Sequence, residues 1–181
     1  LTTLVAPVEP GATGISAALV GHILDLLRER FEFVVVDTPP AFDDQVLAAF
    51  DRSDLIALIA TLDIPALKNL KLTLETLELL NYPREKWAVV LNRADSKVGL
   101  AMNEVEKTLK VPISAQIPSS RDVPASINRG TPIVLDDAKH PVSMAIKQFA
   151  ERYVMPVHQA DTSIPAELRS DRRGFLRRKA K

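Results

Sequence analysis

The feature that most constrains the fold of this chain is an alternation between short apolar runs and longer stretches with helical spacing. Four runs rich in valine, isoleucine and leucine cover residues 1–6, 31–36, 55–60 and 87–91, and two weaker runs cover residues 112–116 and 133–135. Continuous apolar runs of this length are typical of strands that helices cover on both faces. The pattern therefore predicts an α/β fold with a mostly parallel sheet flanked by helices.

The stretches between these runs carry apolar side chains three or four residues apart, as one face of a helix does. The predicted stripes are Ile15, Leu19, Ile23, Leu26 and Leu27; Leu67, Leu70, Leu74 and Leu77; Val105 and Leu109; and Val142, Ile146, Phe149 and Tyr153. Asn103 and Glu106 have the spacing of a capping box at the start of the third helix. Pro141 predicts the first turn of the fourth helix, and Gly130 predicts the end of a short helix before it.

Composition narrows the class of protein. The 181 residues include no cysteine, so a disulfide framework, a thiol nucleophile and a cysteine-bearing metal site are excluded, and a cytoplasmic location fits best. No apolar run approaches the roughly 18 residues that indicate a membrane span. We expect one globular domain over residues 1–155 and a basic, disordered tail over residues 156–181.

The balance of 23 basic and 23 acidic side chains conceals this tail. Residues 161–181 carry seven basic and three acidic side chains, and the rest of the chain is net acidic. Phe175 and Leu176 lie among the basic residues, so residues 165–181 are either a peripheral contact for an anionic membrane or a solvated end. No nucleic acid is expected as a partner, because the folded part offers no basic stripe.

Asp37 is the first candidate for chemistry. It ends the apolar run at residues 31–36 and is followed by Thr38, Pro39 and Pro40. Ligands bind beyond the carboxyl ends of strands in open parallel sheets, so Asp37 is placed to hold Mg²⁺ directly or through water. It is equally well placed to accept hydrogen bonds from the turn that the prolines close.

Two further segments end in polar residues. Asn92 and Arg93 follow the run at residues 87–91, and the Asn92 side chain offers the donor and the acceptor that suit the edge of a purine. Residues 115–134 read as a strand, a loop with Ile117 and Pro118, a short helix and a return. Arg121 and Arg129 in this segment are candidates for nucleotide or partner contacts, or for plain surface positions.

Other polar residues have structural explanations. Asp63 precedes a leucine-striped helix, where it is either a helix cap or part of a switch or dimer face. His22, His140 and His158 are scattered in no metal-binding spacing, and His140 is expected near a helix start. No G-x-S-x-G elbow of a serine hydrolase is present.

Four phrases together resemble the MinD/ParA family of deviant P-loop ATPases. They lie at residues 36–40 (Val-Asp-Thr-Pro-Pro), 63–69 (Asp-Ile-Pro-Ala-Leu-Lys-Asn), 91–93 (Leu-Asn-Arg) and 117–132, where Ile-Pro leads to Asn-Arg-Gly-Thr-Pro. Their order and spacing are most similar to the CpaE/TadZ-like proteins of pilus assembly. The resemblance covers about residues 1–154.

The resemblance implies ATP and Mg²⁺ as cofactors, a homodimer formed through bound nucleotide, and slow hydrolysis used as a localisation switch. Asp37 would organise Mg²⁺ and water in the catalytic step, with Thr38 and Pro39 as its switch turn. Asn92, Arg93, Ile117 and Pro118 would bind the adenine part of the nucleotide. The implied partners are pilus-assembly or polar-localisation proteins, at the inner face of the membrane.

One departure from the family is clear. The phosphate-binding loop G-x-x-x-x-G-K-S/T is absent, and Gly11 and Gly14, the two glycines nearest to each other, are followed by no such lysine. We therefore expect a P-loop NTPase-like domain that is incomplete at its N-terminus, inactive and poorly stable by itself. The alternatives are a non-hydrolysing scaffold with a degenerate ATPase fold, and a MinD-like cell-division regulator or ParA-like partitioning ATPase.

Overall fold

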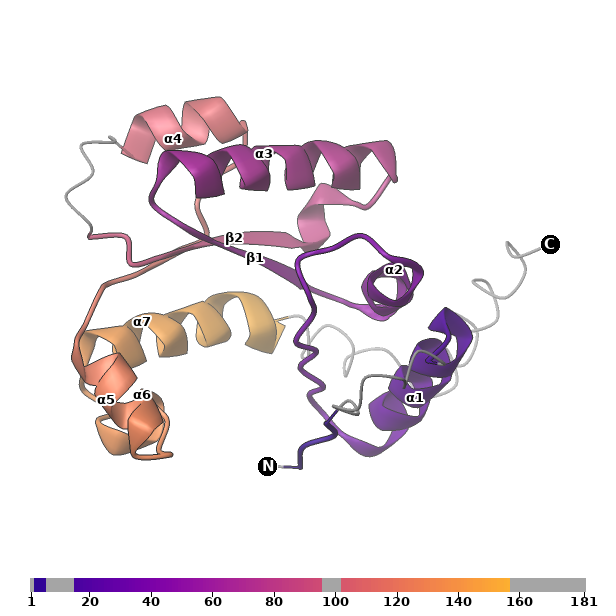
Figure 1. Ribbon diagram of the computed structural model, residues 1–181, viewed down its shortest axis with the longest axis horizontal. Coiled ribbons are helices and arrows are strands. Elements are labelled where there is room, and N and C mark those ends of the chain that lie inside the picture. The colour runs from indigo at the N-terminus through magenta and orange to yellow at the C-terminus, as the bar shows by residue number, and fades with distance from the viewer. Residues whose placement is uncertain (1, 6–14, 96–101, 157–181) are drawn as a thin grey trace. The chain divides into compact units, whose positions relative to one another are not determined.

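The computed structural model describes residues 2–5, 15–95 and 102–156 (Figure 1). The chain divides into two compact units, Leu1–Asp54 and Leu55–Lys181. The first contains two helices, and the second contains a parallel sheet with helices on both faces. Residues 157–181 lie outside the described residues, so the predicted tail and its membrane contact stay predictions.

The first unit is built on α1 (Ala17–Arg30) and α2 (Asp44–Arg52). The Ser16 hydroxyl caps α1 by accepting the Leu19 N–H at 3.1 Å, and the Asp43 carboxylate caps α2. Leu24 of α1 and Val46 of α2 are buried. The stripe predicted for α1 is only partly right, because Leu19 and Leu26 are exposed and the deepest apolar residue is Leu24.

Two ion pairs fasten the ends of these helices. Arg28 reaches Asp54 at 3.2 Å, and Arg52 reaches Asp25 at 3.1 Å. The Arg52 guanidinium lies directly over Gly21, where a Cβ would stand 2.5 Å from it. The missing side chain at Gly21 thus lets the Arg52 guanidinium lie against the backbone of α1.

The strand predicted at residues 31–36 is not formed. The chain is irregular there, and Val35 is 93% exposed. No strand is assigned to the described part of residues 1–6 either, so the residues described in the first unit offer no ladder partner. A strand requires hydrogen bonds from a neighbouring strand, and apolar composition alone does not supply them.

The second unit contains β1 (Ile56–Thr61), β2 (Trp87–Asn92) and β3 (Ala115–Ile117). All pairings are parallel, and the strand order is β1-β2-β3. These strands correspond to the runs predicted at residues 55–60, 87–91 and 112–116. The predicted class, α/β with a parallel sheet flanked by helices, is confirmed.

Helices cover both faces of this sheet (Figure 1). On one face lie α3 (Ile64–Leu79) and α4 (Met102–Leu109). On the other lie α5 (Asp122–Asn128), α6 (Ile133–Asp136) and α7 (Pro141–Phe149), and α7 continues as a π-helical turn over Ala150–Val154. A short 3-10 turn, Arg84–Lys86, leads into β2.

The core of the second unit centres on β2. Ala88 and Leu91 have no exposed surface, and Leu77 of α3 is equally buried. On the opposite face Val90 packs with Ile133 and Val142. The predicted stripes of α3 and α4 are largely confirmed, since Leu70, Leu74, Leu77, Val105 and Leu109 are buried and Leu67 is half-buried. The stripe predicted for α7 is only partly right, because Val142 is buried and Phe149 and Tyr153 are half-buried, but Ile146 is exposed.

Two local predictions in this unit are wrong. Residues 133–135 form the helix α6, because Pro132 directs the chain into a turn whose carbonyl accepts the Leu135 and Asp136 N–H groups. Asn103 lies inside α4, and the Glu106 carboxylate accepts the Ile113 N–H at 2.9 Å, so these two residues form no capping box.

Among the residues that the structure describes, every helix is too short or too polar to cross a membrane.

Candidate functional site

The carboxyl ends of the three strands lie side by side. Thr61 at the end of β1 pairs with Asn92 at the end of β2, and Asn92 pairs with Ile117 at the end of β3. Because the strands are parallel, the loops that follow them leave from one edge of the sheet. This register brings together the sequence-predicted residues Asn92 and Ile117, with Arg93 and Pro118 next to them.

The Asn92 side chain is held in one orientation. Its Oδ1 accepts the N–H of Arg93 at 3.0 Å, and Asn92 itself is exposed at the sheet edge. Arg93 has a φ of 55°, an uncommon left-handed value for a residue with a side chain. This arrangement leaves the amide Nδ2 donors and the second Oδ1 lone pair for a ligand.

The loops after β2 and β3 are joined by two hydrogen bonds. The Ala94 N–H donates to the Ile117 carbonyl at 3.0 Å, and the Ser119 N–H donates to Asp95 Oδ1 at 2.5 Å. Residues 92–95 and 117–119 are called the edge site below. It combines an exposed amide, a buried Ile117 and a half-buried Pro118.

Asp95 and Ser119 belong to the edge site although no sequence pattern singles them out. Their contact joins two loops that are 24 residues apart in the chain. The backbone N–H of Ser119, followed by the Ser119 hydroxyl, holds the pKa of the Asp95 carboxyl below its ordinary value. Asp95 is therefore ionised near neutral pH.

At the end of β1, Asp63 is a helix cap. Its Oδ1 accepts the Ala66 N–H at 2.9 Å at the start of α3, and its Oδ2 accepts the Thr61 hydroxyl. The Thr61 hydroxyl and then the Ala66 N–H lower the pKa of this carboxyl. The capping role predicted for Asp63 is confirmed, and its place at a switch or dimer face stays a prediction.

Ser120, Asp122 and His140 also meet, but not as a catalytic triad. His140 caps α7, since its Nδ1 accepts the Val142 N–H at 3.1 Å. In the neutral ring the proton must then be on Nε2, which faces Ser120 Oγ at 3.2 Å and Asp122 Oδ2 at 3.3 Å. A protonated Nε2 cannot accept the serine proton, so these contacts hold the loop before α5 against the start of α7. The expected position of His140 at a helix start is confirmed.

The arginines considered from sequence have different surroundings. Arg129 pairs with Asp136 of α6, while Arg121 is exposed directly before α5.

Gly130 has a φ of +72° after α5, as the predicted end of that helix requires.

Asp37, Thr38 and Pro39 lie in the first unit, whereas the edge site lies in the second. Asp37 is exposed, and the Pro39 carbonyl accepts the Ala41 N–H at 2.8 Å in the turn that follows. Within the described residues, no three histidine, aspartate or glutamate side chains gather into a set that could hold a metal ion. The roles predicted for Asp37, Thr38 and Pro39 stay predictions.

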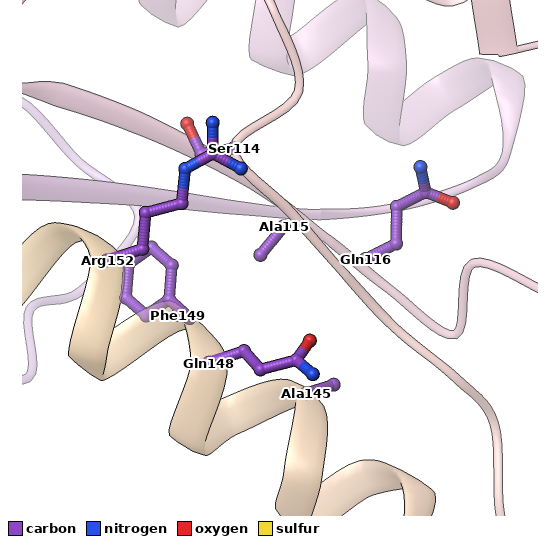
Figure 2. Close-up of a pocket in the computed structure, with 7 residues that line it drawn as sticks. All are labelled: Ser114, Ala115, Gln116, Ala145, Gln148, Phe149 and Arg152. Carbon is purple, nitrogen blue, oxygen red and sulfur yellow. The ribbon is translucent and has the colours of Figure 1, made fainter.

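A separate hollow lies between β3 and the end of α7 (Figure 2). Its volume is 110 Å³, below the roughly 300–1,000 Å³ of ligand pockets. Figure 2 shows Gln116 directed away from Phe149 and Arg152, so the polar side chains around the hollow do not converge. The edge site is thus the better candidate for ligand binding.

Comparison with known proteins shows which proteins this chain is similar to. The chain is 26% identical over 119 residues to the septum site-determining protein MinD of Thermotoga maritima, a match that covers 63% of this chain and 44% of that protein. It is 27% identical over 161 residues to the chloroplastic MinD homologue of Arabidopsis thaliana, covering 85% of this chain and 49% of the homologue. No family model matches the sequence.

Solved structures give the fold. A ParA family ATPase from Chlorobium tepidum superimposes with a TM-score of 0.76 at 21% identity, covering 81% of this chain and 62% of that one. The fold is that of the ParA/MinD ATPases. The MinC:MinD complex of Aquifex aeolicus superimposes with a TM-score of 0.67 at 22% identity, covering 76% of this chain and 59% of that one. MinD of Pyrococcus horikoshii, solved with Mg-ADP, superimposes with a TM-score of 0.64 at 17% identity, covering 75% of this chain and 56% of that one.

The ParA/MinD fold is present here in part. The chain spans about half the length of the curated MinD relatives that it matches. It is similar to MinD proteins, and the finer resemblance to CpaE/TadZ-like proteins is taken up as a proposal below.

Proposed function

We propose that this chain carries the adenine-binding and switch elements of a MinD/ParA-like ATPase. The observation that carries the proposal is the register of Asn92 beside Ile117 at the carboxyl edge of the sheet. The exposed Asn92 amide offers a donor and an acceptor, and the half-buried Pro118 offers an apolar contact for a purine base, while the Ile117 side chain packs in the core with Val90. One of the structural neighbours, the MinD of Pyrococcus horikoshii, was solved with Mg-ADP.

The residues present fit one part of the nucleotide. Asn92, with Arg93, would bind the edge of adenine, and Ile117 with Pro118 would cover its face. The phosphates have no counterpart, because these 181 residues contain no G-x-x-x-x-G-K-S/T motif. We propose that a phosphate-binding loop lies elsewhere in a longer polypeptide, in keeping with the half-length match to MinD relatives.

Mg²⁺ would be held by Asp37, an exposed carboxylate of the type that Mg²⁺ prefers. Bound Mg²⁺ supplies positive charge against the phosphate oxygens. Thr38 and Pro39 would fix the turn that directs Asp37, and the turn closed by the Pro39 carbonyl supports this role.

Nucleotide-dependent dimerisation would make the protein a cytoplasmic localisation switch. The phrases at residues 36–40, 63–69, 91–93 and 117–132 favour a role in Flp/Tad pilus assembly, with polar-localisation proteins as partners. The MinD relatives favour a cell-division regulator instead, and one MinD neighbour was solved with MinC. Residues 165–181 would add a peripheral membrane contact.

The experiment is equilibrium binding of a fluorescent ATP analogue. We expect weak or no binding by the 181 residues alone, and micromolar or tighter binding by the natural polypeptide that contains them. Asn92→Ala should weaken binding about tenfold, since two hydrogen bonds of about 0.5–1.5 kcal/mol each are removed. Asn103→Ala, at an exposed position on α4, is the matched control and should bind like the wild type.

Two outcomes would contradict the proposal. Tight ATP binding by the 181 residues alone would disprove the missing phosphate loop. A natural polypeptide that binds no ATP would favour the alternative function, a non-hydrolysing scaffold that keeps the fold for partner binding.

A further inference from the structure

The edge site depends on the spacing of two loops. Asn92 ends β2, Ile117 ends β3 and Pro118 follows directly, so a base bound over this edge of the sheet would touch both loops at once. The last strand pairing is Asn92 with Ile117, and beyond it the sheet ladder gives no further support. Whatever holds the loops after this point sets the distance between the amide and the apolar surface.

Two hydrogen bonds do so, and they run in opposite directions. The Ala94 N–H donates from the first loop to the Ile117 carbonyl, and the Ser119 N–H donates from the second loop to the Asp95 carboxylate. The second bond has a carboxylate as its acceptor, and hydrogen bonds to charged acceptors are stronger than those between neutral groups. The Ser119 N–H that lowers the pKa of Asp95 is the same donor, so the carboxylate form and the contact support each other.

We propose that Asp95 is a positioning residue that fixes the Asn92 amide relative to Ile117 and Pro118, and thereby determines selectivity for adenine over other bases. This inference rests on the proposed function of the edge site. Base selectivity requires that donor and acceptor meet their partners, and a polar site rejects a base that leaves its groups unpaired. Loosening the loops should reduce this discrimination and leave contacts to the phosphates unchanged.

Asp137 provides a matched control. It is also an exposed aspartate whose carboxylate accepts one backbone N–H, that of Lys139 at 2.9 Å. That contact lies within one loop, after α6, and joins nothing to the edge site. Asp95→Ala and Asp137→Ala remove the same charge and the same kind of hydrogen bond, and only the first separates the two loops.

The experiment measures the dissociation constants of ATP and GTP for the natural polypeptide that contains these residues. We expect Asp95→Ala to reduce the preference for ATP over GTP about tenfold, the scale set by losing one charge-assisted hydrogen bond. Asp95→Asn keeps a neutral acceptor and should lie between wild type and Asp95→Ala. Asp137→Ala should keep the wild-type preference.

Amide hydrogen exchange at Ser119 provides a second measurement that does not depend on nucleotide. Exchange should be faster in Asp95→Ala than in wild type and unchanged in Asp137→Ala. A wild-type protein that binds neither nucleotide would contradict the proposed function itself. An unchanged preference in Asp95→Ala, an equal loss in Asp137→Ala, or unchanged Ser119 exchange would each disprove the positioning role alone.

Discussion

Residues 31–36 and β2 (residues 87–92) have similar apolar sequences, but only β2 forms a strand. Both contain consecutive valines, and both end at a polar residue: Asp37 follows residues 31–36, and Asn92 is the last residue of β2. In β2, Val89 is 2% exposed and Leu91 is fully buried. In the other run Val35 is 93% exposed, and no strand forms.

The difference lies in the partners. β2 has β1 on one side and β3 on the other, with helices on both faces. The described residues of the first unit, 2–5 and 15–54, supply no strand to residues 31–36. Apolar composition therefore makes a segment capable of being a strand, and neighbouring strands decide whether it becomes one.

The largest test of this contrast is Leu91→Ala. A fully buried leucine at the centre of the sheet should lose about 2–5 kcal/mol of unfolding free energy when truncated. The whole unfolding free energy of a small domain is only about 5–15 kcal/mol. We expect no cooperative urea transition for the variant, measured by the fluorescence of Trp87, the one tryptophan of the chain, which begins β2. A wild-type midpoint would show that β2 is not the core.

The second test compares one substitution in the two runs. Val89→Ala should cost about 2 kcal/mol, from two lost methyl-sized groups and a cavity, while Val35→Ala should change stability by less than about 0.5 kcal/mol. Both values come from urea unfolding of the same chain. If a longer polypeptide pairs residues 31–36 with another strand, Val35→Ala should become as costly there as Val89→Ala. Equal costs in the 181 residues would contradict the structure.

The third test concerns a signal that needs no neighbouring strand, the Asp63 cap of α3. Asp63→Ala should lower the unfolding midpoint at pH 7, by less than Leu91→Ala does. Because folding lowers the pKa of Asp63, its contribution is complete above the ordinary pKa and is lost as pH falls through the folded pKa. Wild type and variant should therefore converge in acid. A difference that persists after the Asp63 carboxyl is protonated in the folded protein would contradict the capping role.

The smallest expected effect is a gain. Lys110 has a φ of 57° directly after α4, and its N–H donates to the Glu106 carbonyl at 2.8 Å. Glycine takes this left-handed conformation without steric cost, so Lys110→Gly should raise stability by about 0.5–1 kcal/mol. Thermal unfolding measures the gain, and Lys107→Gly, inside α4, should instead destabilise.

Local signals were predictable from the sequence. The stripe of α3, the cap at Asp63 and the helix end at Gly130 all depend on side chains within or directly next to one element. The register that sets Asn92 beside Ile117 followed from parallel strands ending at one edge.

Signals that depend on distant residues were not predictable. The failure of residues 31–36 to pair, and the helical turn at residues 133–135, depend on which segments are available as neighbours. The Asp95 contact with Ser119 depends on loop geometry, for which the chain carries no periodic pattern.

The sheet has β1 as an outer strand in the part of the chain that the structure describes, and Ile59 on that strand is 68% exposed. An outer strand of a parallel sheet presents unpaired N–H and carbonyl groups in register with an added strand. The outer edge of β1 is therefore a surface that a separate peptide strand can pair with. A second peptide that pairs with β1 would cover Ile59. Its binding would be measured as slower amide exchange along β1.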